Sequence, residues 1–203
     1  MTRFPEFILA SASPRRRDLL AGAGYRFEVV PPTLPEPVPT KALSDPAPLA
    51  EALAYFKARS VEQRAPDRVV LGADTIVSCR GEILGKAGDA DEARRMLSAL
   101  SGSTHSVITG LAVLAPGPGQ FPRRYLASDT TSLVMRELSV EEIDGYVASG
   151  EWCDKAGAYA IQETADAFVE RIDGSFSNVV GMPMELLERL LDVVARDMEG
   201  KDD

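Results

Sequence analysis

The sequence predicts an α/β fold built on a mixed β-sheet with flanking helices, and two observations support this prediction. Strand-like apolar runs alternate along the chain with runs in which apolar residues recur at helical spacing. Several strand-like runs are separated only by a short turn, so some neighbouring strands are expected to pair as antiparallel hairpins. Hydrophobic residues make up 45% of the 203 residues, which is enough for a sizeable core. This length suits a single domain, 1–203, or one domain with two lobes.

Turn and cap residues set the element boundaries in the first half of the chain. Ser13 and Pro14 suit the N-cap and the first turn of a helix, and Gly22 and Gly24 suit its end. Seven prolines between 31 and 48 predict a surface loop. The predicted elements are a strand at 7–10, a helix at 14–22, a strand at 25–30, a helix at 48–63, a strand at 68–79 and a returning hairpin strand at 80–84.

Capping residues also mark the helices of the second half. Asp89 with Glu92, and Ser139 with Glu142, match the pattern of a helix N-terminus, and Gly150 suits a helix end. The predicted elements are a helix at 89–102, strands at 105–114 and 125–136, a helix at 139–150, a strand at 167–172, an amphipathic helix at 183–198 and a disordered tail at 198–203.

Composition and charge exclude several classes of function. The formal net charge of -9 argues against binding of nucleic acid polymers, which normally need a basic surface. No apolar run approaches the ~20 residues that span a bilayer, and no secretory leader is recognised, so we expect a cytoplasmic protein without membrane contact. Cys79 and Cys153 are isolated, so neither a disulfide nor a zinc framework is expected. His105 is the single histidine, which excludes multi-histidine metal sites and favours a structural role for this residue.

The segment ILASASPRRRDLL, 8–20, places small hydroxyl residues and arginines where a strand gives way to a helix. Free backbone N–H groups and the macrodipole at a helix N-terminus favour an anion. Ser11 and Ser13 add hydroxyl donors, and Arg15 and Arg16 add planar guanidinium groups that suit phosphate oxygens. The segment therefore predicts a phosphate-binding site.

Asp74 is a second candidate, because it interrupts the apolar run VVLGADTIV. A carboxylate is costly to bury unless it is hydrogen-bonded, paired or bound to a metal. The functional interpretation is a metal ligand or a base that activates water, since carboxylates suit magnesium and manganese. Further polar candidates, each weak on its own, are Glu36, Lys57, Lys86, Lys155 and Gln162.

Both candidate segments also have a structural interpretation. The basic helix start can be solvated, with Arg17 paired to Asp18 or Glu28. Asp74 can occupy a tight strand corner and bond its own backbone. The small residues and glycines of GSFSNVVGMPM can let the backbone approach a ligand closely, or form a loop before the last helix.

Taken together and in order, the motifs of the chain resemble the Maf family of nucleoside triphosphate pyrophosphatases. The resemblance covers nearly the full chain, and the ordered set is far more specific than any one motif. After Gln162 the family pattern has a glycine, whereas this chain continues ETADAF. The matching segments are LASASPRRRDLL, LAYFKA, VVLGADTIV, LGKAGDADEARRML, THSVITGL, DKAGAYAIQ and GSFSNVVGMPM.

The resemblance implies a fold with two lobes around a cleft, related to the inosine triphosphate pyrophosphatases. It implies hydrolysis between the α and β phosphates, giving a nucleoside monophosphate and pyrophosphate, with a divalent cation such as Mg²⁺, Mn²⁺ or Co²⁺. Asp74 matches the catalytic proton acceptor, and Asp74 and Glu36 are the implied metal ligands. Glu36, Lys57 and Lys86 match active-site positions, and Ser11, Arg15 and Arg16 match phosphate-binding positions.

Three residues of the matching motifs bear on which nucleotide base the family member prefers. Arg15, Thr75 and Gln162 match the branch of the family that prefers dTTP and UTP, and the branch that prefers 7-methyl-GTP typically carries other residues there. Three rival functions remain as alternatives. One is a regulatory protein that inhibits septum formation through nucleotide binding or a cell-division partner. The second is a 7-methyl-GTP pyrophosphatase, and the third is a hydrolase of sugar phosphates or DNA phosphates. A nucleoside triphosphate is the expected small-molecule partner, and a homodimer is a further candidate association.

Overall fold

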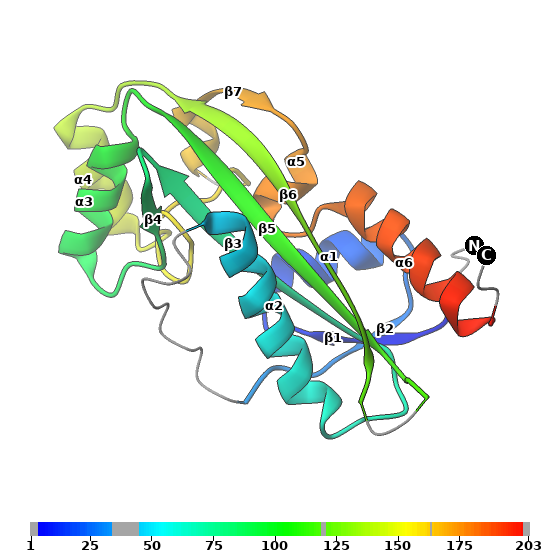
Figure 1. Cartoon of the computed structure of the whole chain (residues 1–203). Helices are drawn as coiled ribbons and strands as arrows, with labels where there is room; N and C mark the ends of the chain where they lie inside the picture. The colour runs from blue at the N-terminus through cyan, green and yellow to red at the C-terminus, as the bar shows by residue number, and fades with distance from the viewer. Residues whose placement is uncertain (1–3, 34–44, 119–120, 163, 201–203) are drawn as a thin grey trace. The chain divides into compact units, whose positions relative to one another are not determined.

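The computed structural model describes residues 4–33, 45–118, 121–162 and 164–200 (Figure 1). It confirms the predicted mixed α/β fold. The elements are β1 (Phe7–Ala10), α1 (Pro14–Gly22), β2 (Phe27–Val29), α2 (Pro46–Glu62), β3 (Val70–Cys79), β4 (Glu82–Leu84), α3 (Ala90–Leu100), β5 (Thr104–Ala115), β6 (Arg123–Met135), α4 (Val140–Ser149), the 3₁₀ helix η1 (Thr164–Phe168), β7 (Val169–Asp173), α5 (Phe176–Val180) and α6 (Met184–Met198).

The strands pair in the order β2-β1-β3-β5-β6-β7, and β4 pairs with β3. The sheet is mixed, as predicted: β1 is parallel to β2 and to β3, whereas β4 is antiparallel to β3 and β7 is antiparallel to β6. The chain divides into two compact units, and the division points fall within β3, β5 and β6. Unit 1 comprises 1–74, 109–129 and 181–203, and unit 2 comprises 75–108 and 130–180. That these units are two lobes of a single domain around a cleft stays a prediction.

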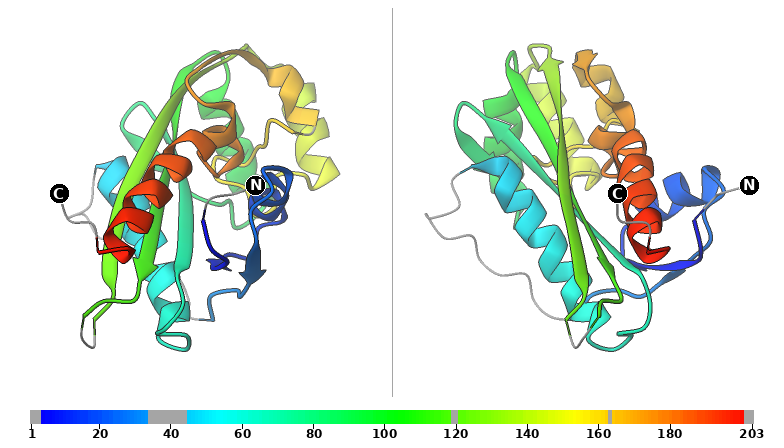
Figure 2. Two further views of the ribbon diagram at one scale, coloured as in Figure 1. Left: turned by 90° about the vertical axis from the view of Figure 1, so that its right-hand side faces the viewer. Right: turned by 45° about the vertical axis from the view of Figure 1, so that its right-hand side comes forward.

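Alternate residues of β3 face two different layers of unit 1. Leu71 and Ala73 belong to an apolar cluster that includes side chains of α1 and α6, whereas Val70 belongs to a second cluster with side chains of α2. Figure 2 shows α2 and α6 on opposite sides of the strands of this unit. Because successive side chains of a strand point to opposite faces, Asp74 lies on the same side as Val70, facing α2.

Two glycines let α2 lie unusually close to the strands of unit 1. A Cβ atom on Gly72 would lie 2.3 Å from the carbonyl oxygen of Ala54, and one on Gly110 would lie 2.4 Å from the backbone nitrogen of Glu51. Both distances are far below van der Waals contact, so no other residue fits at either strand position without moving the helix. The facing positions of the helix are alanines, which completes the close approach.

Unit 2 contains the hairpin that the sequence predicts after β3. Arg80 and Gly81 form its two-residue turn, with φ values of 51° and 81°. Positive φ at both central residues is the signature of a type I′ turn, whose twist matches that of the flanking strands. Cys79 pairs with Glu82 across the turn, which fixes the register of β4.

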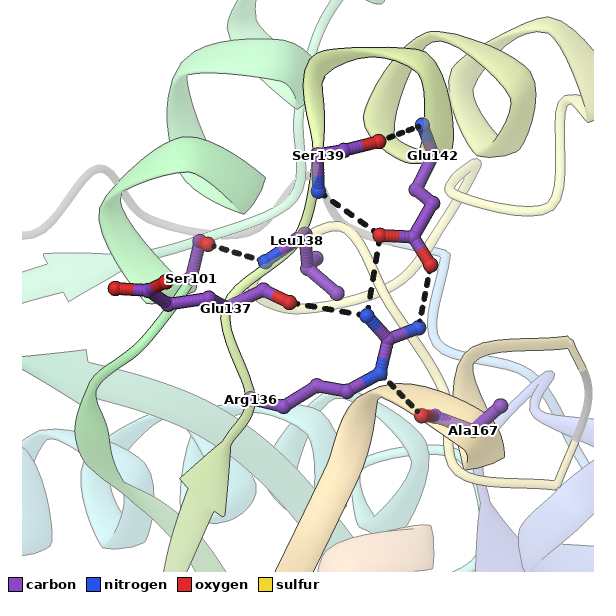
Figure 3. Close-up of polar contacts among 7 residues, drawn as sticks. All are labelled: Ser101, Arg136, Glu137, Leu138, Ser139, Glu142 and Ala167. Atoms are coloured by element: carbon purple, nitrogen blue, oxygen red, sulfur yellow. Dashed lines mark hydrogen bonds and ion pairs between the residues drawn. The ribbon is translucent and has the colours of Figure 1, made fainter.

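The predicted capping box at the start of α4 is confirmed, and Figure 3 shows the network around it. The backbone N–H of Glu142 donates to Ser139 Oγ at 3.2 Å, and the backbone N–H of Ser139 donates to the Glu142 carboxylate at 2.9 Å. Arg136 donates to the same carboxylate at 2.6 and 3.1 Å and to the carbonyl oxygen of Ala167 at 2.9 Å. The Arg136 guanidinium lowers the pKa of Glu142 to about 2, so this exposed network is ionised at neutral pH.

Several boundaries differ from the prediction, each for a local reason. The helix predicted at 48–63 begins at Pro46, because the Asp45 side chain accepts from the backbone N–H of Ala47 and caps it there. Ser13 occupies the N-cap position of α1, but its side chain makes no capping hydrogen bond. The segment GSFSNVVGMPM contains the five-residue helix α5, too short to show a helical period. Met198 ends α6, and 201–203 lie outside the described residues.

Candidate active site

A buried lysine–carboxylate pair lies at the centre of the candidate site in unit 1. Lys57 of α2 donates from its ammonium group to Asp74 Oδ1, and the two side chains are only 11% and 9% exposed. Lys57 lies on the same stripe of α2 as Ala54 and Ala58, which pack against the strands. The close approach of α2 at Gly72, two residues before Asp74, therefore brings the ammonium group to the carboxylate.

The Lys57–Asp74 pair explains why a carboxylate can be buried within an apolar strand. Desolvation of an isolated carboxylate is very unfavourable, and an ammonium group at hydrogen-bond distance offsets part of that cost. Within the described part of the chain, Lys57 is the residue that bonds to the Asp74 carboxylate, through Oδ1. The geometry leaves Oδ2 to contact a water molecule or a cation. The structural interpretation, in which Asp74 bonds its own backbone, is therefore wrong: the observed partner of the carboxylate is Lys57.

Arg16 holds the backbone beside Asp74. Its guanidinium donates to the carbonyl oxygen of Ala73 at 2.7 Å, to the carbonyl oxygen of Gly181 at 2.8 Å, and to Ser11 Oγ at 3.3 Å. Arg16 is 8% exposed and Ser11 is 5% exposed. Arg16 therefore ties the start of α1 to β3 and to the residue that follows α5. This fixes the strand at the residue before the candidate base.

The other residues of the helix start have different surroundings. Ser13 is half-buried, and its backbone N–H donates to Ser11 Oγ at 3.2 Å. Arg15 is half-buried and makes no hydrogen bond or ion pair to a residue that the structure describes. Arg17 forms an exposed ion pair with Asp18 at 3.0 Å, as the structural interpretation expected. The Arg15 guanidinium therefore has no polar partner among the described residues and can bind a ligand, whereas the phosphate-binding role of Arg16 stays a prediction.

Substitution of the two candidate arginines is expected to separate their roles. Arg16→Ala removes the hydrogen bonds to two backbone carbonyls, and it should lower the free energy of unfolding by on the order of 3 kcal/mol. Arg15→Ala should change stability by less than about 0.5 kcal/mol, as surface substitutions do. It should weaken triphosphate binding by roughly 10- to 100-fold, and monophosphate binding less, because a charge-assisted hydrogen bond is lost. Urea unfolding and nucleotide titration measure both, and equal stability of the two variants would contradict this division.

Unit 2 carries the other candidates. Lys86 follows β4, is 55% exposed in its side chain, and lies 3.7 Å from Asp154 Oδ1. Thr75 is the first residue of this unit and is half-buried in β3, next in sequence to Asp74. Gln162 is exposed in a turn, and Lys155 is only 6% exposed. Lys86 and the segment that precedes Gln162 meet directly, because Lys86 and Ala156 form an antiparallel β-bridge.

The predicted metal site is described only in part. Glu36 lies outside the described residues, so its pairing with Asp74 stays a prediction. Among the residues that the structure does describe, no group of three or more histidine, cysteine, aspartate or glutamate side chains is arranged to hold a metal ion. The Asp74 carboxylate fits a hard divalent cation as one oxygen ligand, since Mg²⁺ commonly binds through one or two carboxylates together with substrate phosphates.

A membrane span requires a helix of sufficient length and hydropathy. Among the described residues, no helix reaches both.

The structure also brings together residues that the sequence prediction did not connect. Lys155 was noted only as a flanking charge, whereas the structure buries it to 6% exposure. The carbonyl oxygens of Ala73 and Gly181 gave no signal, because any residue carries such a group. His105 is in the interior of unit 2, where Nε2 lies 2.6 Å from the hydroxyl of Tyr159.

The α/β fold places a buried lysine–aspartate pair in the same unit as an arginine-rich strand-to-helix junction. This combination is typical of proteins that bind anionic, phosphate-bearing ligands. The family model described as "Maf-like protein" matches residues 6–194, and the chain belongs to this family. A dTTP/UTP pyrophosphatase of Moorella thermoacetica is 44% identical over 97% of this chain and 98% of its own. The protein of the same name from Geobacter sulfurreducens is 49% identical over 90% of this chain and 94% of its own.

Two solved structures superpose on this chain at low sequence identity. The Ham1 protein of Staphylococcus aureus superposes with a TM-score of 0.49 at 14% identity, covering 94% of this chain and 100% of that chain. A nucleoside-triphosphatase, dITP/XTP pyrophosphatase, of Mycobacterium abscessus superposes with a TM-score of 0.42 at 16% identity, covering 72% of this chain and 95% of that chain.

Proposed function

We propose that this protein is a nucleoside triphosphate pyrophosphatase that hydrolyses dTTP and UTP to the monophosphate and pyrophosphate. The observation that carries the proposal is the buried Lys57–Asp74 pair, in a chain whose relatives at 43–49% identity are named dTTP/UTP pyrophosphatases. The reaction adds water across the α–β phosphoanhydride and breaks one P–O bond. The water loses a proton, and the leaving pyrophosphate carries away the negative charge of the broken bond.

Asp74 is proposed to accept the proton of the attacking water. Its Oδ1 is held by Lys57, so the carboxylate has one fixed orientation and Oδ2 is the oxygen directed to the water. Arg16 supports this geometry by bonding the carbonyl that precedes Asp74. Ser11 and Ser13 are proposed to contact phosphate at the start of α1.

Arg15 and Lys86 are proposed to neutralise the developing charge of pyrophosphate, because electrostatic stabilisation and positioning supply most of the catalysis in phosphoryl transfer. When bound, a divalent cation would neutralise phosphate charge, and Asp74 and Glu36 are the proposed ligands.

Thr75 and Gln162 are proposed to contact the nucleotide base. A glutamine amide offers a donor and an acceptor, which match the neighbouring N–H and carbonyl of thymine or uracil. A cytoplasmic setting suits a nucleotide substrate, and a homodimer or a cell-division partner stays a prediction.

A pyrophosphate-release panel tests the substrate class. The panel holds dTTP, UTP, CTP and 7-methyl-GTP, each with Mg²⁺, Mn²⁺ or Co²⁺. We expect dTTP and UTP to exceed CTP by roughly 10- to 100-fold in kcat/KM, because cytosine leaves one amide partner unpaired. The Gln162→Glu variant should lose dTTP and UTP hydrolysis. Equal kcat/KM for dTTP, CTP and 7-methyl-GTP would contradict the proposal, and a preference for 7-methyl-GTP would assign the chain to the alternative branch. Pyrophosphate release from none of them would leave the regulatory function.

A further inference from the structure

The segment 154–162, DKAGAYAIQ, has a backbone that must be held in place. Asp154, Gly157 and Ala158 all have positive φ values, of 59°, 68° and 60°. Ala158 is fully buried and carries a Cβ, so its left-handed conformation is sterically unfavourable in isolation. Such a conformation persists only when the surrounding structure determines it. The contacts that determine it therefore bear on what the segment does.

The first half of the segment is fixed to the end of the β3–β4 hairpin. The backbone N–H of Gly157 donates to the carbonyl oxygen of Gly85 at 2.9 Å, and Ala156 forms the β-bridge with Lys86. A Cβ atom on Gly157 would lie 3.0 Å from a methyl group of Val77, and the φ of 68° is rarely adopted by other residues, so both features favour glycine here. Both contacts lie before Ala158 and do not reach Gln162.

Just after Gln162, the Glu151 carboxylate accepts from the backbone N–H and the hydroxyl of Thr164 at 3.2 and 2.8 Å. Within the second half of the segment itself, the buried polar side chain is that of Tyr159. Its hydroxyl lies 2.6 Å from His105 Nε2, and the two rings meet edge to face at 5.6 Å and 86°. His105 is 2% exposed and Tyr159 is 5% exposed. Burial lowers the pKa of His105 to about 4, partly opposed by the backbone of Ser103, and burial also raises the pKa of Tyr159. At neutral pH, a neutral imidazole thus faces a neutral hydroxyl, which is the combination that shares one hydrogen bond.

We propose that His105, acting through Tyr159, is a positioning residue that sets base discrimination by holding the turn that presents Gln162. Gln162 is exposed and follows Tyr159 by three residues, so the anchored Tyr159 restrains the backbone before Gln162, as the Glu151–Thr164 hydrogen bonds do after it. An amide distinguishes uracil or thymine from cytosine only when its donor and acceptor are placed to within about 0.5 Å. The inference rests on the proposed function, because it assigns the preference for dTTP and UTP to this turn.

Tyr159→Phe tests the proposal, because it removes the hydroxyl and keeps the ring. We expect the ratio of kcat/KM for dTTP to that for CTP to fall by about 10-fold, mainly through the KM for dTTP. Tyr125→Phe is the matched control. It removes a hydroxyl that bonds Asp197 Oδ2 at 2.7 Å in unit 1, and we expect it to keep the ratio of the unmutated protein. Amide hydrogen exchange of 154–162 should accelerate in Tyr159→Phe, whereas the core strands should keep their exchange rates.

A pair of His105 substitutions separates positioning from general destabilisation. His105→Gln retains a polar group that can bond the Tyr159 hydroxyl, whereas His105→Leu fills the space and retains none. We expect Gln to keep the dTTP-to-CTP ratio within about threefold, and Leu to lower it as Tyr159→Phe does. A purely structural role predicts that discrimination follows thermal stability rather than the hydrogen bond.

The outcomes are distinguishable from failure of the proposed function. If the unmutated protein prefers dTTP to CTP and Tyr159→Phe retains the full preference, the inference is wrong and the proposed function stands. The same conclusion follows if exchange in 154–162 accelerates while the ratio stays unchanged. If the unmutated protein shows no preference for dTTP, the proposed function fails, and the assignment of base discrimination to this turn fails with it.

Discussion

Asp74→Asn is expected to lower the rate of pyrophosphate release from dTTP by roughly 10²- to 10⁴-fold, the contribution of a positioned general base. The amide keeps the size and shape of the side chain, and its oxygen can still accept a hydrogen bond from Lys57. Loss of the negative charge leaves the buried ammonium group less well compensated, so we expect the variant to fold with a free energy of unfolding lower by about 1–3 kcal/mol. Single-turnover kinetics and urea unfolding measure the two effects separately.

Asp67→Asn is the matched control for this substitution. Asp67 is exposed in the turn before β3, so the same chemical change should alter neither rate nor stability by a measurable amount. A second variant, Lys57→Met, leaves the Asp74 carboxylate buried without its cation. It should cost about 3–5 kcal/mol in stability. We expect this loss to exceed that of Asp74→Asn, because methionine cannot donate to the buried carboxylate, whereas the oxygen of the asparagine amide can still accept from Lys57. If Asp74→Asn releases pyrophosphate at the rate of the unmutated protein, the Lys57–Asp74 pair has a structural role only.

Local patterns were sufficient to predict most elements of the fold. The alternation of strand-like and helix-like runs gave the α/β class, and the spacing of Ser139 and Glu142 predicted a capping box that the structure contains. These features depend on residues within one turn of each other, so periodicity and cap preferences report them directly. The helix α5 was missed for the same reason, because five residues are too few to show a period.

The site required contacts that no local pattern reports. Lys57 and Asp74 were each singled out, but their pairing depends on how closely α2 packs on β3. Arg16 was interpreted as a phosphate ligand from its place in the motif, whereas its bonds to Ala73 and Gly181 span up to 165 residues of sequence. The roles in catalysis and substrate binding assigned to all these residues stay predictions, as does the role of Glu36.

Gly145→Ala is the control for a glycine-to-alanine substitution at Gly72, because the added methyl group meets no neighbouring atom at position 145. Gly145 is in α4, and a Cβ atom there would have nothing within 4 Å. Alanine is the better helix former, so this variant should gain about 0.5–1 kcal/mol in stability. It lies in unit 2 and makes no contribution to the Lys57–Asp74 pair.

Gly72→Ala is expected to lower both stability and activity, although it adds one methyl group to a buried strand. The added Cβ would lie 2.3 Å from the carbonyl oxygen of Ala54 and 2.9 Å from the backbone nitrogen of Ala58. Both are backbone atoms, so α2 itself must move, and we expect a loss of roughly 3 kcal/mol or more. Because Lys57 is on this part of α2, a shift of about 1 Å should separate it from Asp74 and slow hydrolysis by on the order of 10²-fold. Thermal unfolding and pyrophosphate release measure the two losses, and a variant that keeps its rate while losing stability would show that the close approach at Gly72 serves packing alone.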